Sequence, residues 1–145
     1  THRVDNIEDE LKKLKLVSCR LSSNQNIKRE TDILIVDSYG KTKSFYHSCK
    51  NVFLGGSLIN HGGQNPLEAT RFGCNVLHGP NIGNFIEIYN FLKKNKISRK
   101  ITNERKMVNT LYVLLKKKPN SKKIQYKLKL IGQKILNSTL KEIKL

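Results

Sequence analysis

Short apolar runs alternate with amphipathic stretches along the chain, a pattern typical of an α/β protein. The apolar runs are only a few residues long, and the one at residues 33–36 is rich in β-branched residues. They predict strands at residues 16–20, 33–36, 52–54, 76–77 and 97–101. Apolar residues at helical spacing predict helices at residues 5–16, 42–49, 65–73, 84–94, 103–117 and 121–145. Strands that alternate with helices predict a mostly parallel sheet covered by helices on both faces, built as one domain over residues 1–145.

Turn and cap residues place the ends of these elements. Asn65, Asn84 and Asn103 each stand where a helix N-cap is expected, and Pro66 occupies the first helical position. Pro119 is expected to end the helix predicted at residues 103–117. In parallel sheets ligands bind beyond the carboxyl ends of the strands, so the loops at residues 37–40, 55–63 and 79–83 are expected to share that edge.

Composition narrows the class of protein. The net charge of +17 favours anionic partners, although a solvated basic surface from biased composition explains it equally well. The three widely spaced cysteines, Cys19, Cys49 and Cys74, favour free thiols in a reducing compartment over a disulfide frame or zinc site. The sequence has no apolar run long enough to span a membrane, and no signal peptide is expected. It opens at Thr1 without an initiator Met, which predicts a piece of a longer protein.

The candidate chemistry lies in the glycine-rich stretch of residues 55–68. Gly55, Gly56 and Ser57 follow a predicted strand, where backbone N–H groups and a hydroxyl can surround an anion. Residues 61–64 then lead into a helix start, whose N–H groups and dipole also favour a phosphate. Taken singly, these features also fit a turn, a flexible connection, and a capping box between Asn65 and Glu68.

The same stretch resembles the signature of the bacterial 3-deoxy-D-manno-octulosonic acid (Kdo) transferases. The run GGSLINHGGQNPLE at residues 55–68 is similar to the family's GGS, HGG and NPLE elements. The sequence DSYG at residues 37–40 is similar to the family's D-T-x-G element, and Gly79-Pro80 with Asn84-Phe85 is similar to its G-P-x-x-x-N-F element. The resemblance implies a Rossmann-like domain that forms one lobe of a two-lobed GT-B glycosyltransferase, with the N-terminal acceptor-binding domain absent.

The resemblance also implies a ligand and residue roles. The donor is expected to be CMP-Kdo, with its phosphate against Gly55, Gly56 and Ser57, and its ribose held by Glu68. His61 and Asn65 are expected to shape the loop or contact the donor. The full set of expected donor-binding residues is Gly55, Gly56, Ser57, His61, Gly62, Gly63, Asn65, Glu68, Gly79 and Pro80.

The implied reaction is inverting transfer of Kdo to a lipid A precursor in lipopolysaccharide biosynthesis. The general base is expected in the missing lobe, so this chain alone carries no catalytic residue and is expected to be inactive. No metal or other cofactor is implied. The parent enzyme is expected at the cytoplasmic face of the inner membrane, where basic clusters at residues 93–94, 116–118 and 122–123 are candidates for contact with anionic lipid.

Three other classes stay open at this point. Another GT-B enzyme, such as a UDP-sugar transferase or epimerase, would share the glycine-rich loop and a ribose-binding Glu. A nucleic-acid-binding module fits the charge, but the aromatic residues are not interleaved with basic ones, so no specific nucleic acid is expected. A noncatalytic remnant of the transferase fold would also fit the sequence.

Overall fold

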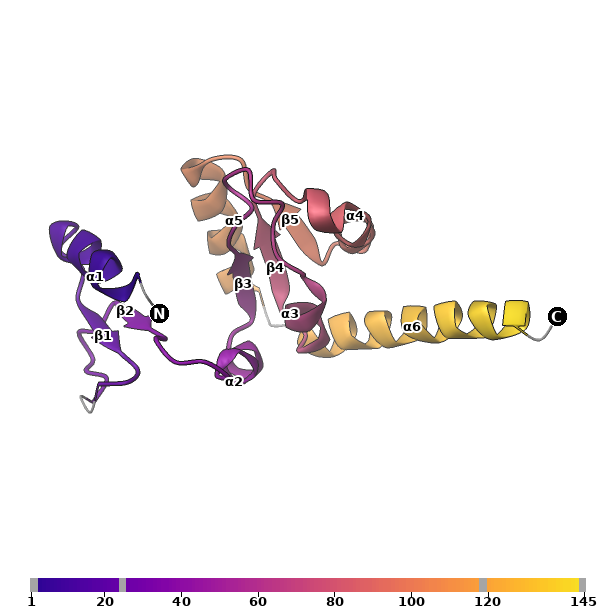
Figure 1. Cartoon of the computed structure of the whole chain (residues 1–145), viewed down its shortest axis with the longest axis horizontal. Helices are drawn as coiled ribbons and strands as arrows, with labels where there is room; N and C mark the ends of the chain where they lie inside the picture. The colour runs from indigo at the N-terminus through magenta and orange to yellow at the C-terminus, as the bar shows by residue number, and fades with distance from the viewer. Residues whose placement is uncertain (1–2, 24–25, 118–119, 144–145) are drawn as a thin grey trace. The chain divides into compact units, whose positions relative to one another are not determined.

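A computed structural model describes residues 3–23, 26–117 and 120–143 (Figure 1). Four features of the sequence lie outside these ranges: the chain start at Thr1, Lys118 of one basic cluster, the predicted helix break at Pro119, and the last two residues of the predicted C-terminal helix. The chain divides into two compact units, Thr1–Ser44 and Phe45–Leu145, and each is described by itself.

The first unit holds one helix and two strands. Helix α1 (Val4–Lys13) precedes strands β1 (Ser18–Arg20) and β2 (Ile33–Ile35), which pair in parallel. Arg20 Nη2 lies 2.5 Å from Asp5 Oδ1 and 2.6 Å from Glu8 Oε2, so α1 is tied to β1 by charge. The hydrogen bond from Arg20 holds the pKa of Glu8 below its usual value.

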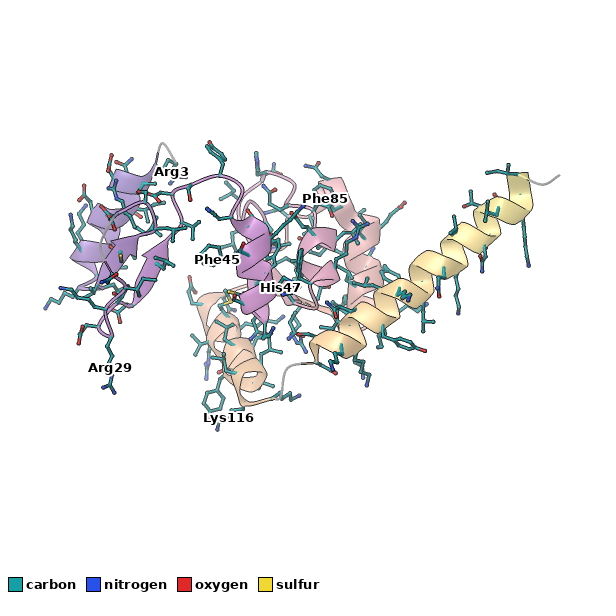
Figure 2. The ribbon with its side chains drawn as sticks, turned by 90° about the horizontal axis from the view of Figure 1, so that it is seen from below. Arg3, Arg29, Phe45, His47, Phe85 and Lys116 are labelled. Carbon is teal, nitrogen blue, oxygen red and sulfur yellow. The ribbon has the colours of Figure 1, made fainter. Side chains whose placement is uncertain are left out.

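The second unit is built on a three-stranded parallel sheet with strand order β3-β4-β5. The strands are β3 (Asn51–Leu54), β4 (Asn75–His78) and β5 (Ser98–Lys100). Helix α2 (Thr42–Ser48) crosses the boundary between the two units and carries Phe45 and His47 (Figure 2). The helical segments that follow are α3 (Leu67–Arg71), the 3₁₀ turn η1 (Gly83–Phe85), α4 (Ile86–Lys94), α5 (Glu104–Lys116) and α6 (Ser121–Ile143).

Successive strand residues point to opposite sides of this sheet, so apolar side chains project from both faces. Helices cover both faces and bury these side chains. Val76 is fully buried in a cluster with Leu54 and Tyr89, on the side of α3 and α4. Its neighbour Leu77 is also fully buried, and packs with Leu114 on the side of α5. A third cluster joins α4 to α6 and consists of Leu92, Ile97 and Ile124, with Ile88, Phe91 and Leu128 at its edge.

The predicted α/β class and the parallel pairing of its strands are confirmed, and the strands form two separate sheets, one in each unit. Asn103 caps α5 as predicted, since its Oδ1 accepts a hydrogen bond from the Lys106 N–H at 2.8 Å. The predicted cap at Asn84 is wrong, because α4 begins at Ile86 after the η1 turn and has Phe85 at its N-cap position. Among the described residues no helix is both long and apolar enough to cross a membrane.

Candidate functional site

The candidate site is formed by two loops that leave the same edge of the β3-β4-β5 sheet. Leu54, the last residue of β3, pairs with His78, the last residue of β4. The loops at residues 55–63 and 79–83 therefore start side by side, as the sequence predicts. Residues 37–40, the third loop of that prediction, belong to the other unit, so their place beside these loops stays a prediction.

Ser57 ties the two loops together. Its side chain is fully buried, and its Oγ donates a hydrogen bond to the Leu54 carbonyl at 2.6 Å while accepting one from the Gly79 N–H at 2.8 Å. The Ser57 carbonyl in turn accepts a hydrogen bond from the Asn81 N–H at 2.9 Å. The hydroxyl that the sequence places on the donor phosphate is thus engaged within the protein, where it fixes the spacing of the loops.

Gly79 is required by this close approach. A Cβ atom at this position would lie 2.2 Å from the Ser57 carbonyl oxygen and 2.8 Å from the Leu58 nitrogen, both of them backbone atoms. No side chain fits in that space without a shift of the backbone.

The glycine-rich loop folds back on itself before it reaches α3. The Gly63 N–H donates a hydrogen bond to the Gly56 carbonyl at 3.2 Å, and both residues have positive φ angles, of 78° and 69°. Such a backbone conformation favours glycine because it needs no Cβ. The Gly62 carbonyl accepts a hydrogen bond from the Asn84 N–H at 3.3 Å, and the Asn84 side chain lies against Gly62, which joins this loop to η1.

The two loops border an open depression of about 610 Å³. Its described lining brings together three of the predicted residues, His61, Gly62 and Pro80. His61 and Pro80 are exposed to solvent, so a ligand in the depression can reach both of them. The remaining lining residues are Asn60, Asn81, Ile82, Gly83, Asn84 and Ile86.

The start of α3 presents fewer free N–H groups than the sequence suggests. Asn65 Oδ1 already accepts a hydrogen bond from the Leu67 N–H at 3.0 Å, and the helix has only five residues. Glu68 lies exposed in its first turn, with its carboxylate available to a ligand. Ser57, Gly63 and Gly79 are the buried members of the predicted set, whereas Gly55, His61, Asn65, Glu68 and Pro80 are exposed.

His78 and Tyr89 support both loops from beneath, and the sequence analysis did not single them out. His78 is 3% exposed, its Nδ1 lies 2.7 Å from the Gly79 carbonyl oxygen, and its ring centroid is 4.3 Å from that of Tyr89. The Tyr89 hydroxyl donates a hydrogen bond to the Gln64 carbonyl at 2.9 Å. Burial raises the pKa of Tyr89 to about 12 and lowers that of His78, so both are neutral at pH 7. The sequence offers one signal for these two supporting residues, which is that His78 ends an apolar strand run.

Metal-binding side chains are not clustered in the described part of the chain. Within residues 3–23, 26–117 and 120–143 no three His, Cys, Asp or Glu side chains come together in a way that could hold a metal ion. The site described above consists instead of backbone groups, hydroxyls, the imidazoles of His61 and His78, and the Glu68 carboxylate.

Comparison with known proteins defines the class to which this fold belongs. The C-terminal CMP-Kdo binding domain of WaaA from Acinetobacter baumannii superposes with a TM-score of 0.80 at 23% identity, over 91% of this chain and 69% of that chain. The chain therefore has the fold of a GT-B glycosyltransferase lobe. No family model matches the sequence.

Sequence relatives define the particular family. A 3-deoxy-D-manno-octulosonic acid transferase of Haemophilus influenzae is 38% identical over 62% of this chain and 21% of its own length. That of Rickettsia typhi is 32% identical over 98% of this chain and 32% of its own length. The chain belongs to the 3-deoxy-D-manno-octulosonic acid transferase family, and it spans about a fifth to a third of the length of these relatives.

Proposed function

We propose that the chain is the donor-binding C-terminal domain of an inverting glycosyltransferase that transfers Kdo from CMP-Kdo to a lipid A precursor. The observation that carries this proposal is the pair of loops tied together by Ser57 at one edge of the sheet. The Kdo transferase relatives, and the CMP-Kdo binding of the superposed domain, support the identity of the donor.

In this proposal the donor phosphate lies against the backbone of the glycine-rich loop. Gly55 has no atom within 4 Å of its Cβ position, so a ligand can approach the backbone there. Gly56 and Gly63 give the loop its shape, while Ser57 and Gly79 position the loops without touching the donor. Glu68 accepts hydrogen bonds from the ribose hydroxyls, and His61, Gly62 and Pro80 contact the donor from the depression.

The remaining parts of the reaction are proposed to lie outside this chain. Transfer needs a general base beside the acceptor hydroxyl, and that base belongs to the acceptor-binding lobe. Donor binding is proposed to need no metal or other cofactor, because backbone N–H groups can stabilise the departing phosphate. The isolated chain is therefore expected to bind CMP but not to transfer Kdo. The complete enzyme is proposed to act at the cytoplasmic face of the inner membrane.

Titration of the nucleotide tests the proposal directly. CMP is expected to shift backbone amide resonances of residues 55–63 and 79–83 in a saturable way, and UMP is expected to bind more weakly. Glu68→Ala is expected to reduce CMP affinity about tenfold, as loss of a charged hydrogen-bond acceptor does. Glu87→Ala is the matched control, since Glu87 is an exposed carboxylate in the first turn of α4.

The outcomes separate the competing classes. Equal affinity for CMP and UMP would contradict a cytidine donor and favour another GT-B enzyme. An equal loss with Glu68→Ala and Glu87→Ala would refute the ribose-binding role of Glu68. Shifts confined to residues outside the two loops would refute the site itself. A chain that binds no nucleotide, whether joined to its acceptor-binding lobe or alone, would be a noncatalytic remnant.

A further inference from the structure

A second hollow lies at the opposite end of the β3-β4-β5 sheet from the candidate donor site. It has a volume of about 390 Å³ and includes Asn51 and Asn75, the first residues of β3 and β4. The two loops of the donor site leave the last residues of these strands, at a distance of roughly 10 Å along a four-residue strand. Figure 1 shows α6 beginning at this end of the sheet, beside α3.

The lining of this hollow, called here the cationic pocket, carries charge of one sign. Six of its described lining residues are basic and none is acidic. The basic residues are Lys50, Lys96, Arg99, Lys117, Lys123 and Lys127. All the ion pairs found among the described residues lie in the other unit, so no carboxylate partner is recorded for these six cations.

Polar and apolar contacts give the pocket a defined wall. Asn75 Nδ2 donates a hydrogen bond to Asn51 Oδ1 at 3.0 Å, and Arg99 Nη1 lies 3.5 Å from Asn75 Oδ1. This row links the three strands of the sheet across the wall of the pocket. Leu114 and Ile124, which are 7% and 5% exposed, close it on the side of α5 and α6.

A further hydrogen bond at the pocket links α6 to the end of α4. Lys127 Nζ donates a hydrogen bond to the Asn95 carbonyl at 3.3 Å. The side chains of Asn95 and Asn120 add polar groups to the lining. Like charges held this close repel one another, most strongly where salt does not screen them, and an anion would relieve that repulsion.

We infer that the cationic pocket binds a phosphate-bearing anion. Phosphate groups match it because several Lys and Arg side chains can donate charge-assisted hydrogen bonds to one group of oxygens. The site is distinct from the donor site, since it lies at the other end of the same strands. The ligand is either a soluble phosphorylated compound or the phosphate of a lipid headgroup, and the two sources share this chemistry.

Inorganic pyrophosphate at constant ionic strength tests the inference. Titration is expected to give one saturable site, with shifts of the side-chain amide resonances of Asn51 and Asn75. Lys117→Gln with Lys123→Gln removes two exposed pocket cations and is expected to weaken binding at least about tenfold. Arg99→Gln, made separately, is expected to weaken it to a similar extent.

The matched control is Lys12→Gln with Lys13→Gln. It removes the same charge from exposed positions of α1 that do not line the pocket, and is expected to change the affinity less than about twofold. Equal weakening by the pocket and control pairs would overturn the inference, because it would show attraction by net charge alone. A wild-type chain with no saturable pyrophosphate site would overturn it as well.

Vesicles then distinguish the source of the phosphate. The chain is mixed with phosphatidylcholine vesicles that contain or lack phosphatidic acid, and bound protein is measured by sedimentation. This comparison is made once the pyrophosphate site has been found. If the chain binds phosphatidic acid vesicles and the Lys117→Gln, Lys123→Gln variant does not, the ligand is a lipid headgroup. Vesicle binding that the pocket and control pairs change equally identifies a soluble phosphorylated ligand instead.

Discussion

Replacing Ser57 with Ala is the sharpest test of how the two site loops are held. The change removes one oxygen atom and leaves the backbone free to keep its conformation. That oxygen makes two hydrogen bonds, at 2.6 Å to the Leu54 carbonyl and at 2.8 Å from the Gly79 N–H, in a fully buried place. The variant therefore leaves a buried carbonyl and a buried N–H group without this partner.

The expected loss of stability follows from those two groups. Leaving a buried polar group unpaired costs about 1–3 kcal/mol, so two groups cost about 2–4 kcal/mol once partial relaxation is allowed. A domain of this size has a free energy of unfolding of about 5–15 kcal/mol, so the loss is a large fraction of the total. For a unit of about 100 residues, the midpoint of thermal unfolding should fall by roughly 10–20 °C.

Urea denaturation followed by far-ultraviolet circular dichroism measures this free energy. Ser98→Ala is the matched control, because Ser98 is 4% exposed and its Oγ makes one longer hydrogen bond, to the Tyr89 carbonyl at 3.4 Å. It is expected to cost less than about 1 kcal/mol. If Ser57→Ala and Ser98→Ala lower the free energy of unfolding equally, the hydrogen bonds of Ser57 between the loops make no special contribution to stability, and the reasoning fails.

Three further predictions concern the same site. Gly79→Ala is expected to cost about 2–3 kcal/mol in urea denaturation, since its Cβ would meet the Ser57 backbone, whereas Gly83→Ala, with no atom within 4 Å, should be nearly neutral. Burial lowers the pKa of His78 below its ordinary value of 6.5, so at low pH the unfolded chain binds a proton more readily than the folded chain does. The contribution of His78 to the free energy of unfolding should therefore be fully present above pH 6.5 and decrease as the pH falls below that value. His78→Gln should remove that dependence and His61→Gln should not, and a pH series of unfolding curves checks both. Addition of EDTA is expected to leave CMP affinity unchanged within about twofold, and a larger loss in the same titration would refute metal independence.

The elements of this fold could be predicted because their signals are local. The apolar run at residues 76–77 is short and bounded by Gly73 and Gly79, and it becomes the central strand β4. Asn103 precedes an amphipathic stretch and caps α5. Asn84 has the same local signal, but its side chain lies against Gly62 of a distant loop, and a tertiary contact of that kind leaves no trace in the neighbouring residues.

The candidate site could be predicted only as far as its position along the chain. The glycines and the resemblance located the loops at residues 55–63 and 79–83, and the structure brings both to one edge of the sheet. The engagement of the Ser57 hydroxyl depends on how closely the two loops approach, which spacing within one loop does not reveal. His78 and Tyr89 were missed because a polar layer beneath a loop is defined by residues from β4 and α4, which lie 11 positions apart.

Strand β4 links the candidate donor site to the cationic pocket. Val76 and Leu77 are fully buried on opposite faces, so a shift in strand register by one residue would move each of them to the wrong face. The strand is therefore held in one register, with Asn75 at its start in the wall of the pocket and His78 at its end, in contact with the loop at residues 79–83. Because side chains along a strand keep a fixed spacing, the two sites lie at a set separation that loop substitutions do not alter. Substitutions that loosen the packing of Val76 or Leu77 should weaken binding at both ends together, whereas Glu68→Ala and Lys117→Gln with Lys123→Gln should each affect one end only.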